Sequence, residues 1–215
     1  MRGNEVKYIS HLDLMRAIER AVRRAGIPVD YSEGFNPRPK IVFALPLPVG
    51  VTSSGEFADF TFSEKIAAED FMNRINSELP EGIKILSAEE LQSKGSIMAE
   101  VRQADYELIA ACDGTFEHAK MIIEKMLVMS EIIANKKTEN GVKKQDIRPM
   151  IKDLSIRLPE KNGFNTTING NNSLVLKISA RVSAGSRENL RPDVLSKVIE
   201  DFSDGIVKVL GIHRK

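Results

Sequence analysis

The sequence predicts an α+β fold made of two tandem domains, residues 1–92 and 104–215. In the first half, segments with the two-residue repeat of β-strands alternate with segments that have the 3.6-residue repeat of amphipathic helices. Their order is strand, helix, strand, strand, helix, strand, and the second half repeats it. This order is typical of ferredoxin-like βαββαβ domains, with antiparallel sheets and helices on one face. The polar segment 89–103 makes the expected linker.

The first helix is predicted over residues 10–25. Ser10 suits the N-cap, and Asp13 places a carboxylate in the first turn, where it faces the positive end of the helix dipole. Gly26 can adopt the left-handed C-cap and Pro28 prevents continuation. One face is apolar and is expected to pack on the core, through Leu14, Ile18, Ala21, Val22 and Ala25.

The opposite face of this helix is basic, with Glu19 as its single acidic residue. It carries Arg16, Arg20, Arg23 and Arg24. Two interpretations are open: a solvated helix surface of no special role, or a surface that contacts the phosphates of a nucleic acid.

The loop that follows, residues 30–40, favours the second interpretation. It combines aromatic and polar side chains, Tyr31, Phe35 and Asn36, with the cations Arg38 and Lys40. Its glycine and two prolines restrict the backbone, and a rigid loop with aromatic and cationic groups suits recognition. The alternative is a plain connection in which Tyr31 and Phe35 pack onto the core.

The other elements of the first domain follow from periodicity. Strands are predicted over residues 6–9, 41–49, 56–62 and 83–86, and a helix over 68–79. Pro46 and Pro48 remove two hydrogen-bond donors from the second strand, so its far part is expected at the margin of the sheet. The segments 41–49 and 56–62 are expected to form a hairpin.

In the second domain, strands are predicted over residues 106–112, 150–158, 174–182 and 206–212, and helices over 115–127 and 192–202. An insertion, residues 130–149, resembles a basic β-hairpin arm around the turn 139–141. Its cations include Lys136, Lys137, Lys143 and Lys144. The alternative is a solvated hairpin without a special role.

The loop 183–192 is a second candidate for anion binding. Small residues lead into a helix, with Arg187 and Arg191 close by, so backbone amides and the helix dipole could hold a phosphate. An ordinary strand-to-helix connection explains the same residues.

Charge and cysteine content restrict the function. The net charge is only +1, so affinity for nucleic acid requires local patches. Residues 1–40 hold eight Lys or Arg against five Asp or Glu, whereas residues 64–107 hold five against ten. Cys112 is the only cysteine, which excludes an intrachain disulfide, a cysteine zinc site and an iron–sulfur cluster held by one chain. We therefore expect a cytoplasmic protein without a membrane span, bound metal or cofactor.

One catalytic alternative involves His11, at the start of the first helix beside Ser10. It could act as a general base toward a ribose hydroxyl, as in a metal-independent ribonuclease. Against this, residues 10, 11 and 13 do not point to one spot on a regular helix. A histidine that anchors the neighbouring loop is the other interpretation.

Several motifs connect the chain to a known family: Tyr8-Ile9-Ser10-His11-Leu12-Asp13, Tyr31-Ser32-Glu33-Gly34-Phe35-Asn36-Pro37-Arg38-Pro39-Lys40, Asp146-Ile147-Arg148-Pro149 and Asn189-Leu190-Arg191-Pro192. They resemble the radical-SAM-linked uncharacterised protein family, known as domain of unknown function 2344, most specifically through residue 62. The resemblance implies a radical-SAM enzyme encoded beside the protein or fused to it. Relatives carry several residues before the equivalent of Arg2, so we expect an incomplete first strand here.

Together these observations predict a non-catalytic accessory protein that binds RNA and presents it to a radical-SAM modifying enzyme. A docking module that binds the enzyme without RNA is the alternative from a different class.

Overall fold

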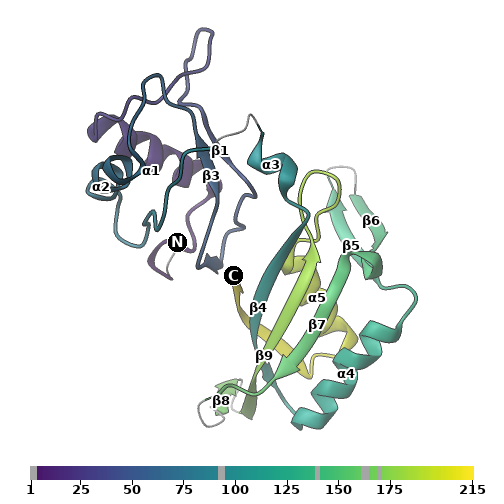
Figure 1. Ribbon diagram of the computed structural model, residues 1–215. Helices are drawn as coiled ribbons and strands as arrows, with labels where there is room; N and C mark the ends of the chain where they lie inside the picture. The colour runs from purple at the N-terminus through teal and green to yellow at the C-terminus, as the bar shows by residue number, and fades with distance from the viewer. Residues whose placement is uncertain (1–3, 92–94, 139–140, 161–164, 169–170) are drawn as a thin grey trace. The chain divides into compact units, whose positions relative to one another are not determined.

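Two sets of helices and strands, Met1–Val101 and Arg102–Lys215, form separate units in a computed structural model of the protein (Figure 1). The structure describes residues 4–91, 95–138, 141–160, 165–168 and 171–215. The fold is α+β, and each unit has its own buried apolar residues.

The N-terminal unit is built on α1 (His11–Arg24) and α2 (Ala68–Asn76). The prediction for α1 is confirmed. Ser10 caps the helix by accepting a hydrogen bond from the Asp13 N–H (3.2 Å), and the chain leaves it through Gly26, which has a positive φ of 60°. Its apolar face meets α2 and the first strand in one core, which includes Leu14, Ile18, Val22, Phe43, Phe71 and Ile75.

The short strands of this unit are β1 (Ile41–Phe43), β2 (Val51–Ser53) and β3 (Ala58–Phe60). β1 and β3 pair antiparallel, with Ile41 opposite Phe60, so the predicted hairpin is present. β1 ends earlier than the predicted strand 41–49. Pro46 and Pro48 have no N–H to donate to a ladder, and the chain bends after Phe43.

Two predicted strands of this unit are wrong. Residues 6–9 follow a 3-10 helix (Asn4–Val6) and turn, with the Ile9 N–H bonded to the Val6 carbonyl (3.3 Å). Residues 83–86 form no strand, because the side-chain amide of Asn76 bonds both the N–H and the carbonyl of Ile85 (2.9 Å each). A short helix, α3 (Ile97–Glu100), ends the unit. The four-strand pattern predicted for the N-terminal half is therefore not confirmed.

The C-terminal unit has an antiparallel sheet with the order β10-β4-β9-β7. The strands are β4 (Gln103–Cys112), β7 (Ile151–Arg157), β9 (Asn171–Ser183) and β10 (Val207–Arg214), and β8 (Asn165–Ile168) pairs with β9. Helices α4 (Phe116–Val128) and α5 (Pro192–Phe202) contact β7 and β10, respectively. The sequence predicted these helices and long strands, apart from β8, to within a few residues of their bounds.

Alternate residues separate the two faces of this sheet. Tyr106, Leu108 and Ala110 of β4 are buried with the apolar residues of the helices, whereas Asp105 and Glu107 lie on the other face and stay partly accessible. Figure 1 shows α5 behind the sheet. Between α4 and β7 the chain forms β5 (Ile133–Thr138) and β6 (Gly141–Asp146), an antiparallel pair in the insertion 130–149, followed by a 3-10 helix (Arg148–Met150).

Candidate functional site

The four arginines on the outer face of α1, which we call the arginine ridge, are Arg16, Arg20, Arg23 and Arg24. All four are exposed, as predicted from helical spacing. Arg16 pairs with Asp13 (3.1 Å) and Arg24 with Glu78 of the segment after α2 (2.7 Å). Arg20 and Arg23 make no salt bridge with any residue that the structure describes. Half of the ridge is thus charge-compensated within the protein, and half presents its charge to solvent.

Asp13 is an integral part of the ridge. The Ser10 hydroxyl donates to its carboxylate (2.7 Å) and the Arg16 guanidinium donates to its other oxygen, and together they hold the pKa of Asp13 below its usual range. The Asp13 carboxylate therefore stays ionised at neutral pH, and Arg16 remains paired.

Residues 30–40 form a projecting hairpin, which we call the finger (Figure 1). Its two sides are tied by backbone hydrogen bonds from Ser32 to Arg38 (2.9 Å) and from Lys40 to Asp30 (2.8 Å), and Tyr31 bridges Pro39. At the base, an ion pair joins Lys40 to Asp30 (2.6 Å), and this lysine lowers the pKa of the Asp30 carboxyl. These bonds give the loop a defined shape although nearly all its side chains are exposed.

The tip of the finger presents Phe35 fully to solvent, with a relative exposure of 106%. Asn36 and Arg38 beside it are exposed, and Tyr31 is exposed at 38%. Arg38 makes no salt bridge with the described part of the chain. The alternative in which Phe35 packs onto the core is therefore wrong. An exposed ring on a braced loop suits stacking or insertion into a partner.

His11 occupies a different environment from that of a general base. Its ring is partly buried and meets the Phe43 ring edge-on, with the centroids 5.4 Å apart. The neighbouring Ser10 hydroxyl is engaged with Asp13. This geometry favours the interpretation of His11 as an anchor between α1 and β1.

The two other predicted basic segments differ from each other. On the β5–β6 hairpin, Lys143 and Lys144 are exposed, whereas the side chains of Lys136 and Lys137 and the turn residues 139–140 lie outside the described residues. Before α5, Arg187 is exposed, but Arg191 makes a two-pronged pair with Asp193 (3.0 and 2.8 Å). The loop 183–192 therefore keeps only one of its two arginines for an incoming anion.

Two further arginines have a structural role that the sequence did not reveal. Arg74 of α2 donates to the carbonyl of Ala25 (3.1 and 2.9 Å), at the C-terminal end of α1. Arg148 donates to the Leu127 carbonyl near the end of α4 (3.2 and 2.6 Å) and to that of Ile151 (3.1 Å). Cations at the C-terminal end of a helix satisfy free carbonyls and complement its dipole.

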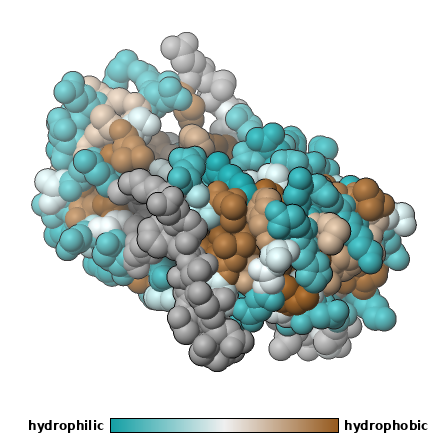
Figure 2. Space-filling view, turned by 90° about the horizontal axis from the view of Figure 1, so that it is seen from below, coloured by the Kyte–Doolittle hydropathy of each residue, from teal (hydrophilic) through white to brown (hydrophobic). Residues whose placement is uncertain are grey.

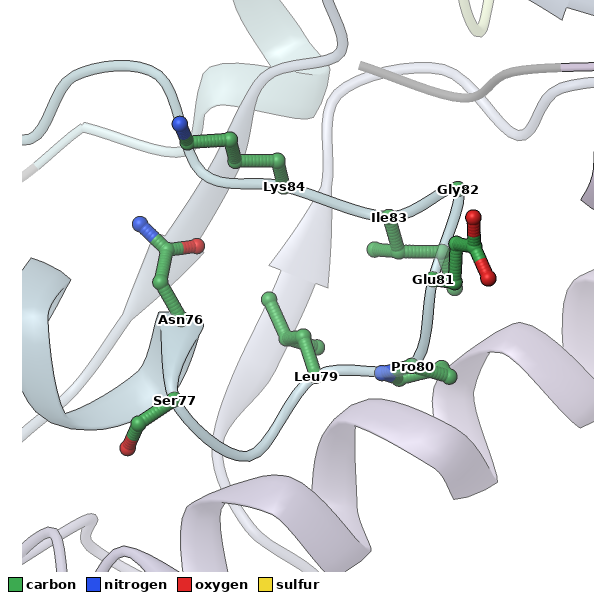
Figure 3. Close-up of a pocket in the computed structure, with 8 residues that line it drawn as sticks. All are labelled: Asn76, Ser77, Leu79, Pro80, Glu81, Gly82, Ile83 and Lys84. Atoms are coloured by element: carbon green, nitrogen blue, oxygen red, sulfur yellow. The ribbon is translucent and has the colours of Figure 1, made fainter.

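A shallow pocket of about 560 Å³ lies at the turn after α2 (Figure 3). The Leu79 and Ile83 side chains point into the space enclosed by the turn, whereas the Glu81 carboxylate points away from it. Asn76, on its rim, uses its amide to bond Ile85. None of the predicted site residues line this pocket, and its polar groups do not converge.

Figure 2 shows apolar residues interspersed with hydrophilic ones on the face seen from below. Singly exposed apolar side chains are common in folded proteins, so we base the candidate site on the ridge and the finger. Among the described residues, no group of three or more His, Cys, Asp or Glu is arranged to hold a metal ion. In the same part of the chain, no helix combines the length and apolarity needed to cross a bilayer.

These features define an α+β protein whose N-terminal unit presents an exposed basic helix and a projecting aromatic finger. The chain belongs to the family described as "Uncharacterized protein conserved in bacteria (DUF2344)", whose model matches residues 1–192. A comparison with curated proteins finds no match.

Proposed function

We propose that this protein is a non-catalytic RNA-binding accessory subunit of a radical-SAM RNA-modifying enzyme. The observation that supports it most directly is the pair Arg20 and Arg23, exposed and without a salt bridge among the described residues, in the unit that also carries the finger. Guanidinium groups that are not neutralised within the protein can pair with phosphates, and each such contact releases counterions from the nucleic acid.

In this proposal the two features have different tasks. Arg20, Arg23 and Arg38 contact phosphates and position the strand, while Phe35 stacks on an unpaired base and Asn36 bonds its edge. Arg16, Arg24 and Lys40, already paired with carboxylates, contribute less. The exposed Lys143 and Lys144, together with Lys136, Lys137 and Arg187, would add electrostatic attraction from the C-terminal unit.

The enzyme partner is inferred from the family resemblance, which implies a radical-SAM protein encoded nearby. The chain has one cysteine, Cys112, and a radical-SAM cluster needs several, so the cluster would belong to the other polypeptide. We place both proteins in the cytoplasm, where a buried free thiol such as that of Cys112 stays reduced.

We also propose a ferredoxin-like arrangement for the fold. Numbered by their order in the C-terminal unit, the strands of its sheet run fourth, first, third, second, with α4 and α5 in the two crossovers, which supports this arrangement there. The N-terminal unit would be a reduced version, in which the Asn76 amide replaces an edge strand.

The test is RNA binding by the double variant Arg20→Glu and Arg23→Glu, measured by filter retention at two salt concentrations. We expect a large loss of affinity and a smaller dependence on salt. The matched control is Lys120→Glu with Lys197→Glu. It changes the net charge equally but lies on α4 and α5, where each lysine is already paired with Glu124 or Asp201. Retention that is independent of salt, or equally reduced in the control, contradicts the proposal.

A docking module without RNA is the second candidate, because a fully exposed phenylalanine on a braced loop also suits a pocket in a partner protein. Purification of the protein with its partner from cells, with and without nuclease, separates the two. A nuclease-resistant complex that is lost in Phe35→Ala, from a protein that binds no RNA, favours docking. We do not favour a ribonuclease that uses His11, because this ring packs against Phe43.

A further inference from the structure

The face of the C-terminal sheet opposite the helices carries a cluster of charged side chains from all four strand positions. At its centre is Glu107 of β4. Three cations converge on its carboxylate: Arg157 of β7 at 3.2 Å, Lys177 of β9 at 3.3 Å and Lys215, which follows β10, at 3.2 Å. We call these four residues the Glu107 cluster.

The cluster has more positive than negative charge. Three cations share one carboxylate, and the only other acidic contact is between Arg157 and Glu160 at 3.8 Å among the described residues, with Glu160 90% exposed. Elsewhere on the same face the charges match one to one, since Arg181 pairs with Asp105 through two hydrogen bonds (2.7 and 3.1 Å). An excess of cations in contact with each other is costly unless an anion lies close by.

The cations can still receive another anion. Glu107 is 15% exposed, whereas the side chains of Arg157, Lys177 and Lys215 are 49%, 32% and 47% exposed. A lysine ammonium has three N–H donors and a guanidinium has five, so each keeps donors beyond those directed at the carboxylates. Lys215 and Lys177 hold the pKa of Glu107 below its usual range despite partial burial, so the carboxylate stays ionised and keeps the cations together.

We propose that the Glu107 cluster binds the backbone phosphate of a single-stranded RNA that lies across the open face of the C-terminal sheet. This is a second contact surface, separate from the arginine ridge and the finger. A sheet face four strands wide does not fit a duplex groove, which admits a helix or a two-stranded ribbon, so a single strand is the form that suits it. The nearest ring on β4, Tyr106, is buried on the opposite face, so binding is through phosphate and independent of base sequence.

The test uses the full chain and a fluorescein-labelled oligouridylate, with the binding constant measured by fluorescence anisotropy across a salt series. Replacing Lys177 and Lys215 by Gln should lower the slope of log K against log salt by about two, one for each lost phosphate contact. The matched control, Lys120→Gln with Lys197→Gln, removes the same charge from the helices and should leave the slope almost unchanged. Lys177→Arg with Lys215→Arg should restore it.

Two outcomes overturn the inference: an unchanged slope in the Lys177 and Lys215 variant, or an equal fall in the control. Full displacement of the RNA by inorganic phosphate at matched ionic strength also overturns it, because that result assigns a small-anion site. If circular dichroism shows that the double variant is unfolded, Lys215→Gln alone should lower the slope by about one. The Arg20 and Arg23 variant tests the ridge separately: loss there with an intact Glu107 cluster effect, or the reverse, tells which surface fails.

Discussion

At the scale of single residues, arginine serves two purposes in this protein, and its surroundings decide which. Arg20 and Arg23 are exposed on the outer face of α1, with no salt bridge among the described residues. Arg74 and Arg148 instead direct their guanidinium groups at backbone carbonyls near the ends of α1 and α4. The first pair is free to meet an anion from outside, whereas the second pair fixes the elements that position the site.

Glu107 gives a prediction about pH. Its carboxyl faces Lys177 on β9, Arg157 on β7, and Lys215 with His213 on the β10 side. Because its pKa is lower in the folded protein than in the unfolded chain, about 4.3, the stabilisation is fully present above that pH and is lost as the pH falls through the folded value. Glu107→Gln should therefore cost more free energy of unfolding at neutral pH than at about pH 3.

Urea unfolding at the two pH values measures this difference. Asp153→Asn, an exposed substitution on the same sheet face, serves as the control. A cost of Glu107→Gln that is independent of pH would show that the carboxylate charge does not contribute to stability.

At the scale of elements, local bonds explain why the finger can be exposed and ordered at once. Backbone pairs at Ser32 and Lys40 and the ion pair of Lys40 with Asp30 close the loop, so the ordering cost is met before any partner binds. Gly26, at φ 60°, lets the chain turn out of α1 toward the finger. The helix that carries the ridge and the finger are thus consecutive parts of one element sequence.

The insertion β5–β6 depends on the motif Asp146-Ile147-Arg148-Pro149. Asp146 accepts hydrogen bonds from the N–H groups of Ile132 and Arg148 (2.9 Å each), and Arg148 bonds the Leu127 and Ile151 carbonyls. Arg148→Gln should leave partly buried carbonyls without donors and lower the free energy of unfolding by about 1–3 kcal/mol, measured by urea denaturation. Arg187→Gln, exposed and without a salt bridge among the described residues, should change it by less than about 0.5 kcal/mol. Equal effects of the two would remove the structural role from Arg148.

At the scale of the whole molecule, the near-zero net charge hides an uneven distribution. The chain carries +1 overall, yet cations concentrate on α1, on the β5–β6 hairpin and around Glu107. Affinity for a polyanion then depends on patches rather than on total charge. This is why the proposed tests compare variants of equal net charge.

The two units also make a prediction about unfolding. Cys112, the only cysteine, is buried in the C-terminal unit, and burial raises the pKa of its thiol, so it should react with a thiol reagent only when that unit opens. Because each unit has its own core, Arg148→Gln should increase the rate of Cys112 labelling in moderate urea, whereas Arg74→Gln should not. Equal acceleration by both variants would show that the units unfold together.

The sequence by itself determined what depends on local periodicity and on chain chemistry. The caps and apolar face of α1, the ends of α5, and the long strands β4 and β9 follow from patterns within each segment. It also predicted that the ridge and the residues of the finger are exposed, since helical spacing and proline placement are properties of neighbouring residues.

The tertiary structure alone decided everything that needs a distant partner. Residues 83–86 have strand-like character, but the Asn76 amide takes their hydrogen bonds, and Glu78 neutralises Arg24 from 54 positions away. The Glu107 cluster arises because the register of four strands brings together residues up to 108 positions apart. Strand pairing is a non-local choice with many alternatives of similar local pattern, so charge matching across a sheet is fixed only when the chain has folded.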